Sequence, residues 1–109
     1  MGRLHVETIQ IDPALLRRTA DGTVLTPEIL ADYAAKLRAQ GRRTDIVRSC
    51  ERVLRQFYDF LSADKLVGKD TLQAWRDQLL VENYAVRSVN SKVSTVNALM
   101  RAWAAGSSK

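Results

Sequence analysis

Residues 41–61, GRRTDIVRSCERVLRQFYDFL, carry the apolar spacing that decides the fold. Apolar residues recur there at intervals of four, three, four and three, and the same intervals return further along the chain. This spacing places each set on one side of an α-helix, where it faces a core. The sequence therefore predicts two core-facing helices with these stripes: Ile46, Cys50, Val53, Phe57 and Phe60 on one, and Val89, Val93, Val96, Met100 and Trp103 on the other.

The first striped helix is predicted to follow another helix in a hairpin. Thr26 is a good N-cap, Pro27 suits the first helical position, and Gly41 suits the position just after a helix. A helix from Pro27 to the residue before Gly41 is expected from these signals. The striped helix then runs from about Thr44 to about Ser62, after a short turn that favours side-by-side packing.

The second striped helix is predicted to form a matching hairpin. Its partner begins near Lys69 and Asp70, and residues 82–85 form the turn. The striped helix itself begins with Ser88 as N-cap and runs to about Ala104. The predicted fold class is therefore all-α, a four-helix bundle of two helical hairpins with an N-terminal extension.

The helical domain is predicted to occupy residues 26–105. Residues 5–12 alternate weakly, and Asp12-Pro13 and Asp21-Gly22 are turn signals. Residues 1–25 are interpreted as an arm or leader, and a packing strand and a disordered segment remain as alternatives. Residues 106–109 are interpreted as a frayed end or linker.

The composition excludes several classes of protein. Of 109 residues, 46% are hydrophobic and 27% are charged, without a long apolar run, so no membrane contact is expected. The single cysteine, Cys50, cannot form an internal disulfide, and a cytoplasmic location is expected. With one histidine, His5, and no Gly-rich phosphate loop or paired carboxylates, no metal, cofactor or catalytic site is expected.

Positive charge accompanies the two striped helices. The net charge is +5, yet residues 38–55 alone carry +4 and residues 84–109 another +4 without any acidic group. The remaining segments are slightly acidic. Charge segregated in this way can create a one-sided field that attracts a polyanion.

Polar residues on these helices are the predicted contacts. On the first striped helix, Arg48, Arg52 and Arg55 lie almost opposite the core stripe, and Arg42 and Arg43 extend this ridge to the N-terminus, where backbone N–H groups attract phosphate. On the second, polar positions form a stripe beside the core, and small side chains there allow close approach to a major groove, where asparagine pairs with adenine. That stripe contains Asn90, Ser94, Asn97 and Arg101, with Arg87, Ser91 and Lys92 in the first turn.

Two segments resemble signatures of tyrosine recombinase (phage integrase) N-terminal domains. Residues 41–61 are similar to a glycine turn, a Thr/Ile-x-Arg-x-Tyr helix start and a Leu-x-x-Phe-x-x-Phe-Leu ending. Residues 88–100 are similar to Thr-Ile-Asn-Arg-x-Leu-Ser-Ala-Leu-Arg-x-Phe. Cys50 stands where the family usually has tyrosine, and Ser91 replaces a common arginine.

This resemblance implies a SAM-like core-binding domain that clamps duplex DNA near a crossover site. A catalytic domain with the family's Arg, His and Tyr residues would follow residue 104, so this fragment would not cleave DNA. The implied partners are double-stranded DNA, that catalytic domain and other recombinase protomers. The predicted DNA-binding residues are Arg42, Arg43, Thr44, Arg48, Arg52, Arg87, Ser88, Asn90, Ser91 and Lys92.

Two alternatives follow from the same residues. One is a DNA-binding accessory or regulatory protein without any enzyme, and the other is a helical bundle that binds an acidic protein partner. The DNA-clamp hypothesis predicts that the two striped helices share one positive face, with Arg48 and Asn90 on the same side of the bundle. Cys50 is predicted to be buried as a small hydrophobe.

Overall fold

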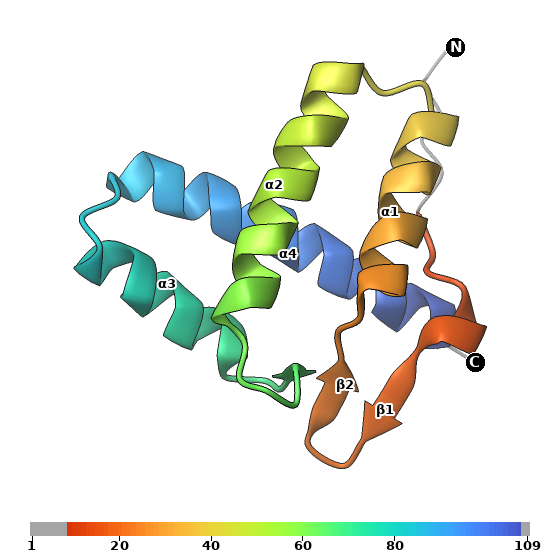
Figure 1. Ribbon diagram of the computed structural model, residues 1–109, viewed down its shortest axis with the longest axis horizontal. Coiled ribbons are helices and arrows are strands. Elements are labelled where there is room, and N and C mark those ends of the chain that lie inside the picture. The colour runs from red at the N-terminus through yellow and green to blue at the C-terminus, as the bar shows by residue number, and fades with distance from the viewer. Residues whose placement is uncertain (1–8, 108–109) are drawn as a thin grey trace, which may run out of the picture.

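The computed structural model describes residues 9–107, and side chains up to residue 104. Four α-helices make up most of it: α1 (Pro27–Ala39), α2 (Thr44–Phe60), α3 (Thr71–Val81) and α4 (Val86–Ser107). In Figure 1, α1 and α2 stand side by side, α4 crosses behind α2, and α3 lies beside α4. The two predicted helical hairpins are therefore present.

Local signals set the ends of α1 as the sequence predicts. The Thr26 hydroxyl oxygen accepts a hydrogen bond from the Ile29 amide (3.2 Å), and Pro27 is the first helical residue. Gly41 has a positive φ of 81°, and the Arg42 amide donates to the Leu37 carbonyl (3.3 Å). This left-handed residue stops the helix and turns the chain into α2.

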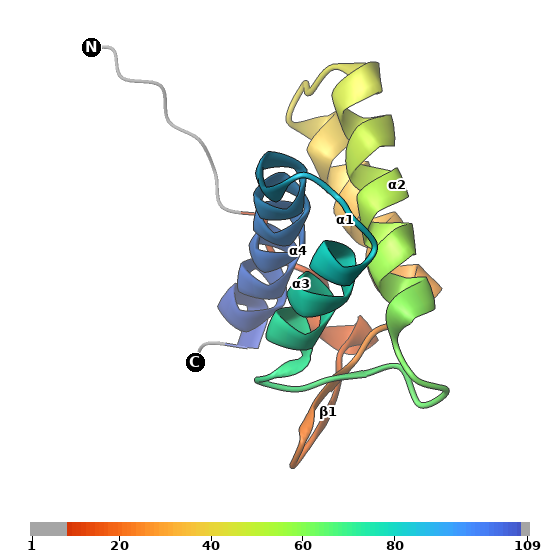
Figure 2. The same cartoon turned by 90° about the vertical axis from the view of Figure 1, so that its left-hand side faces the viewer.

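The N-terminal segment belongs to the folded domain, which corrects its interpretation as an arm. A 3₁₀ turn (η1, Pro13–Leu15) leads into strands β1 (Arg17–Thr19) and β2 (Gly22–Val24), and β2 pairs with β3 (Leu66–Val67). All pairings are antiparallel, and Figure 2 shows the β1–β2 hairpin at one end of the helices. The fold is thus mostly helical with a small sheet. Residues 1–8 and 108–109, part of the predicted arm and end, lie outside the described residues.

Residues at the two ends of the described chain pack together. Ile11 is fully buried, and its amide donates to the Ala102 carbonyl of α4 (3.2 Å). The Arg18 guanidinium donates to the Trp103 carbonyl (2.8 Å). The domain therefore begins before residue 26, and the predicted boundary at that residue is wrong.

The buried side of α2 differs from the predicted stripe. Ile46 is 51% exposed and Phe60 is 36% exposed, whereas Val47, Leu54 and Leu61 are buried. A second stripe with the same type of spacing runs through these three residues and shares Cys50 and Phe57 with the first. The structure selects it because α1 packs along that side of α2.

The stripe of α4 faces the core as predicted. Val89, Val96 and Trp103 are buried, and Val93 and Met100 are partly buried against the same cluster. However, α4 begins at Val86, three residues before the first helical residue expected after a Ser88 N-cap, so Ser88 lies within the first turn and is not the N-cap.

Candidate nucleic-acid interface

The N-terminal halves of α2 and α4 point in different directions from one crossing point. In Figure 1 the two helices diverge from that point in the shape of a V that opens to the upper left, and this arrangement of the two helices is called the V below. Figure 2 looks toward this side, with α2 to the right and α4 to the left. Each helix presents its first turns at a tip of the V, where unpaired backbone N–H groups favour anions.

A polar cluster joins the two helices where they cross. The Lys92 ammonium of α4 donates to the Gln56 side-chain oxygen of α2 (2.8 Å), and the Gln56 amide donates to the Tyr84 hydroxyl (3.1 Å). The ammonium also lies 5.1 Å from the centre of the Tyr84 ring. These contacts hold Lys92 in place, and an ammonium with three donors keeps capacity for a ligand.

The predicted residues at the start of α2 are accessible. Arg42, Arg43 and Thr44 are all exposed. Arg43 pairs with Asp45 at 3.2 Å, but both side chains are more than two-thirds exposed, so this ion pair is weak and exchangeable. Arg42 forms no ion pair with any described residue.

Arg42 acts electrostatically on two groups under the α1–α2 turn. Burial raises the pKa of the Cys50 thiol, Glu51 raises it further, and the Arg42 guanidinium opposes both effects. Burial likewise raises the pKa of Tyr33, as does Cys50, again against Arg42. Cys50 is half-buried and packs against the core, so the prediction that it is buried as a small hydrophobe is confirmed only in part.

The first turns of α4 carry small polar and basic side chains. Arg87, Ser88 and Ser91 are exposed. Along the helix, Ser88 and Thr95 lie one turn before and one turn after Lys92, so they share its flank. No acidic residue occurs from Tyr84 onward. This flank can therefore approach an anionic surface without repulsion from its own helix.

Asn90 lies on a different flank of α4. It is two residues from Lys92, which places it about 200° around the helix. Its side-chain oxygen accepts a long hydrogen bond from the Arg76 guanidinium of α3 (3.5 Å). Asn90 therefore faces α3 and is separated from the V.

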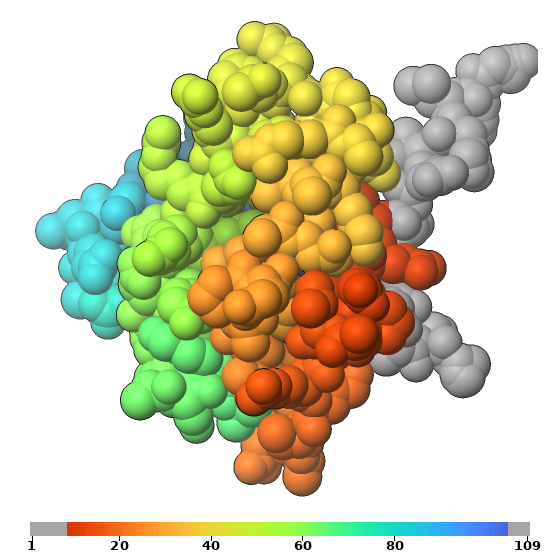
Figure 3. All heavy atoms as spheres, turned by 45° about the vertical axis from the view of Figure 1, so that its right-hand side comes forward, coloured from red at the N-terminus to blue at the C-terminus, as the bar shows by residue number. Residues whose placement is uncertain are grey.

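Arg48 and Arg52 are also separated from the V. They line a hollow of about 480 Å³ on the side of α2 next to α1, together with Leu30, Ala31, Glu51, Leu54 and Arg55. Figure 3 shows α1, in orange to yellow, and α2, in yellow-green, side by side on this face.

The prediction that Arg48 and Asn90 share one positive face is therefore wrong. Both helices pack toward the same core, so the residues opposite the core on each helix point away from one another. Only residues on the flanks of the two core stripes can meet, as Gln56 and Lys92 do.

Sequence reasoning missed Gln56, Tyr84 and Ser49. Ser49 is exposed and lies seven residues before Gln56, on the same flank of α2. Ser49 and Gln56 lie four residues before and three residues after Val53, a partly buried member of the predicted stripe, so their spacing from Val53 could have indicated both. Tyr84 lies in the predicted turn and has no periodic signal.

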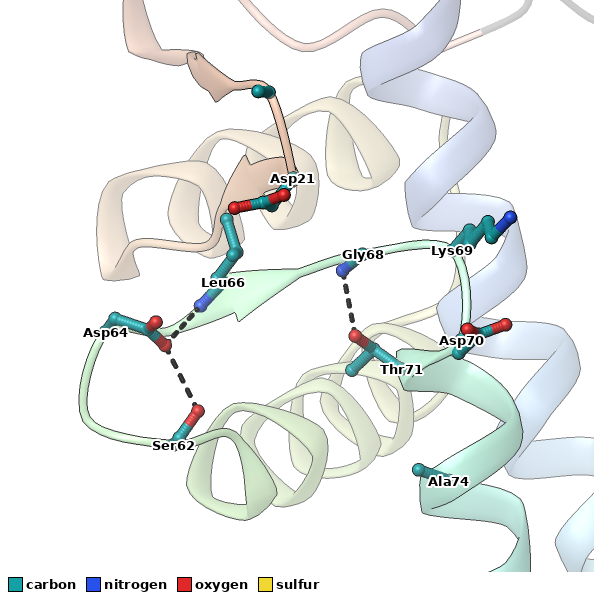
Figure 4. A pocket seen from close by; sticks show the side chains of 10 residues that line it. Asp21, Ser62, Asp64, Leu66, Gly68, Lys69, Asp70, Thr71 and Ala74 are labelled. Atoms are coloured by element: carbon teal, nitrogen blue, oxygen red, sulfur yellow. Dashed lines mark hydrogen bonds between the residues drawn. The ribbon is translucent and has the colours of Figure 1, made fainter.

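A second recess lies beside the sheet, away from the V. Figure 4 shows Asp21, Asp64 and Asp70 around this recess of about 700 Å³. Asp64 accepts hydrogen bonds from the Ser62 hydroxyl (3.1 Å) and the Leu66 amide (3.2 Å), so it is used to shape the turn. The three carboxylates around this recess disfavour the binding of nucleic acid.

Within residues 9–107, no group of three or more His, Cys, Asp or Glu residues is placed to hold a metal ion, and no helix is long and apolar enough to cross a membrane. No family model matches the chain, and comparisons with curated proteins and with solved structures returned no match.

Proposed function

We propose that this chain binds duplex DNA in the V between α2 and α4, as a core-binding domain of the tyrosine recombinase type. The observation that carries the proposal is the pair of helix N-termini that open onto one side, each with exposed basic and small polar residues. Two further facts support it: α4 has no acidic side chain among residues 86–104, and Lys92 is held at the crossing point.

The residues divide into two groups by their place in the V. Arg42, Arg43 and Thr44 at the start of α2 contact phosphates on one side, and Arg87 with Ser88 contacts them on the other. Ser91 and Lys92 lie deeper and approach the base edges or the backbone between them. Arg48, Arg52 and Asn90 are left out of this surface, because their side chains face α1 or α3. The proposal therefore departs from the DNA-clamp hypothesis drawn from the sequence, which required Arg48 and Asn90 on one face, and it rests on the first turns of α2 and α4 and on Lys92 instead.

The resemblance to recombinases sets the proposed context. Strand cleavage would come from a catalytic domain, and this domain would hold the duplex near the crossover site. Alone, the 109-residue chain binds DNA without cutting it.

The first test is a fluorescence-anisotropy titration of the whole chain with labelled duplex and single-stranded DNA. Four cations, Arg42, Arg43, Arg87 and Lys92, face the proposed duplex. Neutralising about four phosphates gives a slope of about −3.6 for the logarithm of the association constant against the logarithm of salt concentration. Equal affinity for both forms of DNA, or a flat salt dependence, contradicts the proposal.

Charge reversals locate the surface. Arg87→Glu and Lys92→Glu are expected to weaken duplex binding by more than about tenfold, because each replaces an attraction to phosphate with a repulsion. Arg17→Glu is the matched control, since Arg17 is equally a surface arginine but lies on β1 at the other end of the molecule. If Arg17→Glu weakens binding as much as the other two, general charge and not the V determines binding.

A further inference from the structure

The end of α3 fixes the position of Tyr84. Asn83 has a positive φ of 69°, a left-handed conformation that asparagine tolerates better than most residues. The Asn83 amide donates to the Leu80 carbonyl (3.1 Å), and the Tyr84 amide donates to the Leu79 carbonyl (3.2 Å). These two bonds close the helix end in the Schellman pattern. Figure 2 shows the turn that follows, in cyan, between α4 and α2, so the Tyr84 side chain reaches α2 from a rigid backbone.

The Tyr84 hydroxyl has a proton that it can donate to a ligand. A tyrosine hydroxyl both accepts and donates hydrogen bonds. Its oxygen accepts from the Gln56 side-chain amide (3.1 Å), and among residues 9–107 no acceptor is bonded to its proton. Tyr84 is 37% exposed, and its hydrogen bond to Gln56 lies at the surface. A ligand in the V can therefore reach this hydroxyl.

The Lys92 ammonium lies beside this hydroxyl. One end of the Gln56 amide donates to Tyr84, and the oxygen at its other end accepts from Lys92 (2.8 Å). The ammonium also lies 5.1 Å from the centre of the Tyr84 ring. Because Tyr84 accepts from the amide nitrogen, the amide oxygen is turned toward Lys92. A charged donor and an uncharged donor thus stand side by side where α2 and α4 cross.

Two neighbouring donors of this kind suit an anionic oxygen. The carboxylate nearest to Tyr84 in the sequence, Glu82, accepts a hydrogen bond from the Gln78 amide further back on α3 (2.9 Å). No acidic residue occurs from Tyr84 onward. A phosphate oxygen accepts hydrogen bonds from ammonium groups and from tyrosine hydroxyls alike.

We propose that Tyr84 is an uncharged phosphate contact of the bound duplex. Its hydroxyl donates to a phosphate oxygen that also accepts from the Lys92 ammonium. Gln56 is a positioning residue, because its amide holds the two donors side by side. This inference rests on the proposed DNA-binding function, and it adds a contact from the α3–α4 turn to those from the first turns of α2 and α4.

The test is Tyr84→Phe in the anisotropy titration of the whole chain with duplex DNA. This variant removes only the hydroxyl and keeps the ring under Lys92 and the bond from Lys92 to Gln56. Since a hydrogen bond to a charged group is lost, the affinity is expected to fall about tenfold. The salt dependence should stay unchanged, because the hydroxyl carries no charge. By contrast, Lys92→Gln should reduce the magnitude of the salt slope by about 0.9.

Tyr58→Phe is the matched control. Tyr58 is also a partly buried tyrosine with a lysine over its ring, since the Lys65 ammonium lies 4.4 Å from the ring centre. It is two residues from Gln56, which places it about 200° around α2 and away from the V. Tyr58→Phe is therefore expected to bind duplex DNA as tightly as the unchanged chain.

Three results overturn the assignment of Tyr84 while the unchanged chain still binds duplex DNA, so that the proposed function stands. The first is an unchanged affinity of Tyr84→Phe, and the second is an equal loss in Tyr58→Phe. The third is a salt slope of Tyr84→Phe reduced as much as that of Lys92→Gln, because Tyr84 would then act only through the charge of Lys92. If the unchanged chain binds no duplex, the proposed function and the role of Tyr84 are both overturned.

Discussion

Tyr33 and Cys50 illustrate how single residues at the α1–α2 turn depend on their surroundings. Both are drawn out of water by the packing of the two helices, and burial is the largest cause of the raised pKa of each. The neutral forms are therefore favoured in the folded protein. Arg42, a proposed phosphate contact, lies close enough to lower both pKa values. The same guanidinium would therefore contact phosphate and influence the ionisation of Tyr33 and Cys50.

Tyr33 should make stability depend on pH in alkaline solution. Its pKa is higher in the folded than in the unfolded chain, so its contribution is complete below the ordinary value of 10.0 and is lost as the pH rises toward the folded pKa. Tyr33→Phe cannot ionise and is expected to lose less stability above pH 10. Urea unfolding at pH 8 and pH 10.5 measures this, and an identical loss in both proteins would exclude Tyr33 as the cause.

The difference at Ile46 and Phe60 is also a matter of single residues. Two stripes with the same type of spacing share Cys50 and Phe57, so the sequence of α2 does not distinguish them. The choice depends on the packing of α1, a tertiary contact that periodicity does not contain. The sequence-based prediction assumed that Arg48 and Asn90 lie on one face of the bundle, and the structure places them on different faces. The candidate site was therefore only partly predictable.

At the scale of elements, the helices were predictable and the strands were not. The four helices have strong periodicity and clear end signals such as Thr26 and Gly41, and their observed bounds lie within a few residues of those expected. The strands have two or three residues each, too few to show alternation. The strands β2 and β3 pair although α1 and α2 separate them in the sequence. No local sequence pattern indicates such a pairing.

Two glycines at element ends should respond differently to alanine. Gly41 has φ 81° with nothing within 4 Å of an added Cβ, so Gly41→Ala is expected to cost only about 1–2 kcal/mol of backbone strain. Gly22 has φ 149°, and its Cβ would lie 2.1 Å from the Val67 carbonyl oxygen. Gly22→Ala should be clearly more destabilising, because β2 must move away from β3. Urea denaturation measures the free energy of unfolding of both variants. Equal decreases in the two variants would contradict the close approach of β2 to β3.

At the scale of the molecule, residues before α1 complete the core. Ile11 is fully buried in the same cluster as residues of α4, so Ile11→Ala is expected to cost about 2–5 kcal/mol of unfolding free energy. A chain that starts at residue 26 should lose cooperative unfolding. Thermal unfolding followed by circular dichroism measures both effects. A truncated chain as stable as the full chain would restore the interpretation of this segment as a separable arm.

The hydrogen bonds from Ile11 to Ala102 and from Arg18 to Trp103 also have a consequence during synthesis. A ribosome produces about 5–20 residues per second, so several seconds pass between the synthesis of Ile11 and the synthesis of its partner Ala102. During that interval α1 and α2 can form their hairpin, while Ile11 has no place to be buried. Because contacts between residues so far apart in sequence slow folding, closure of the N-terminal segment onto α4 is expected to be the last step of folding. The segment before α1 is thus synthesised before its partner in α4, and it is the last part of the domain to become protected from proteases.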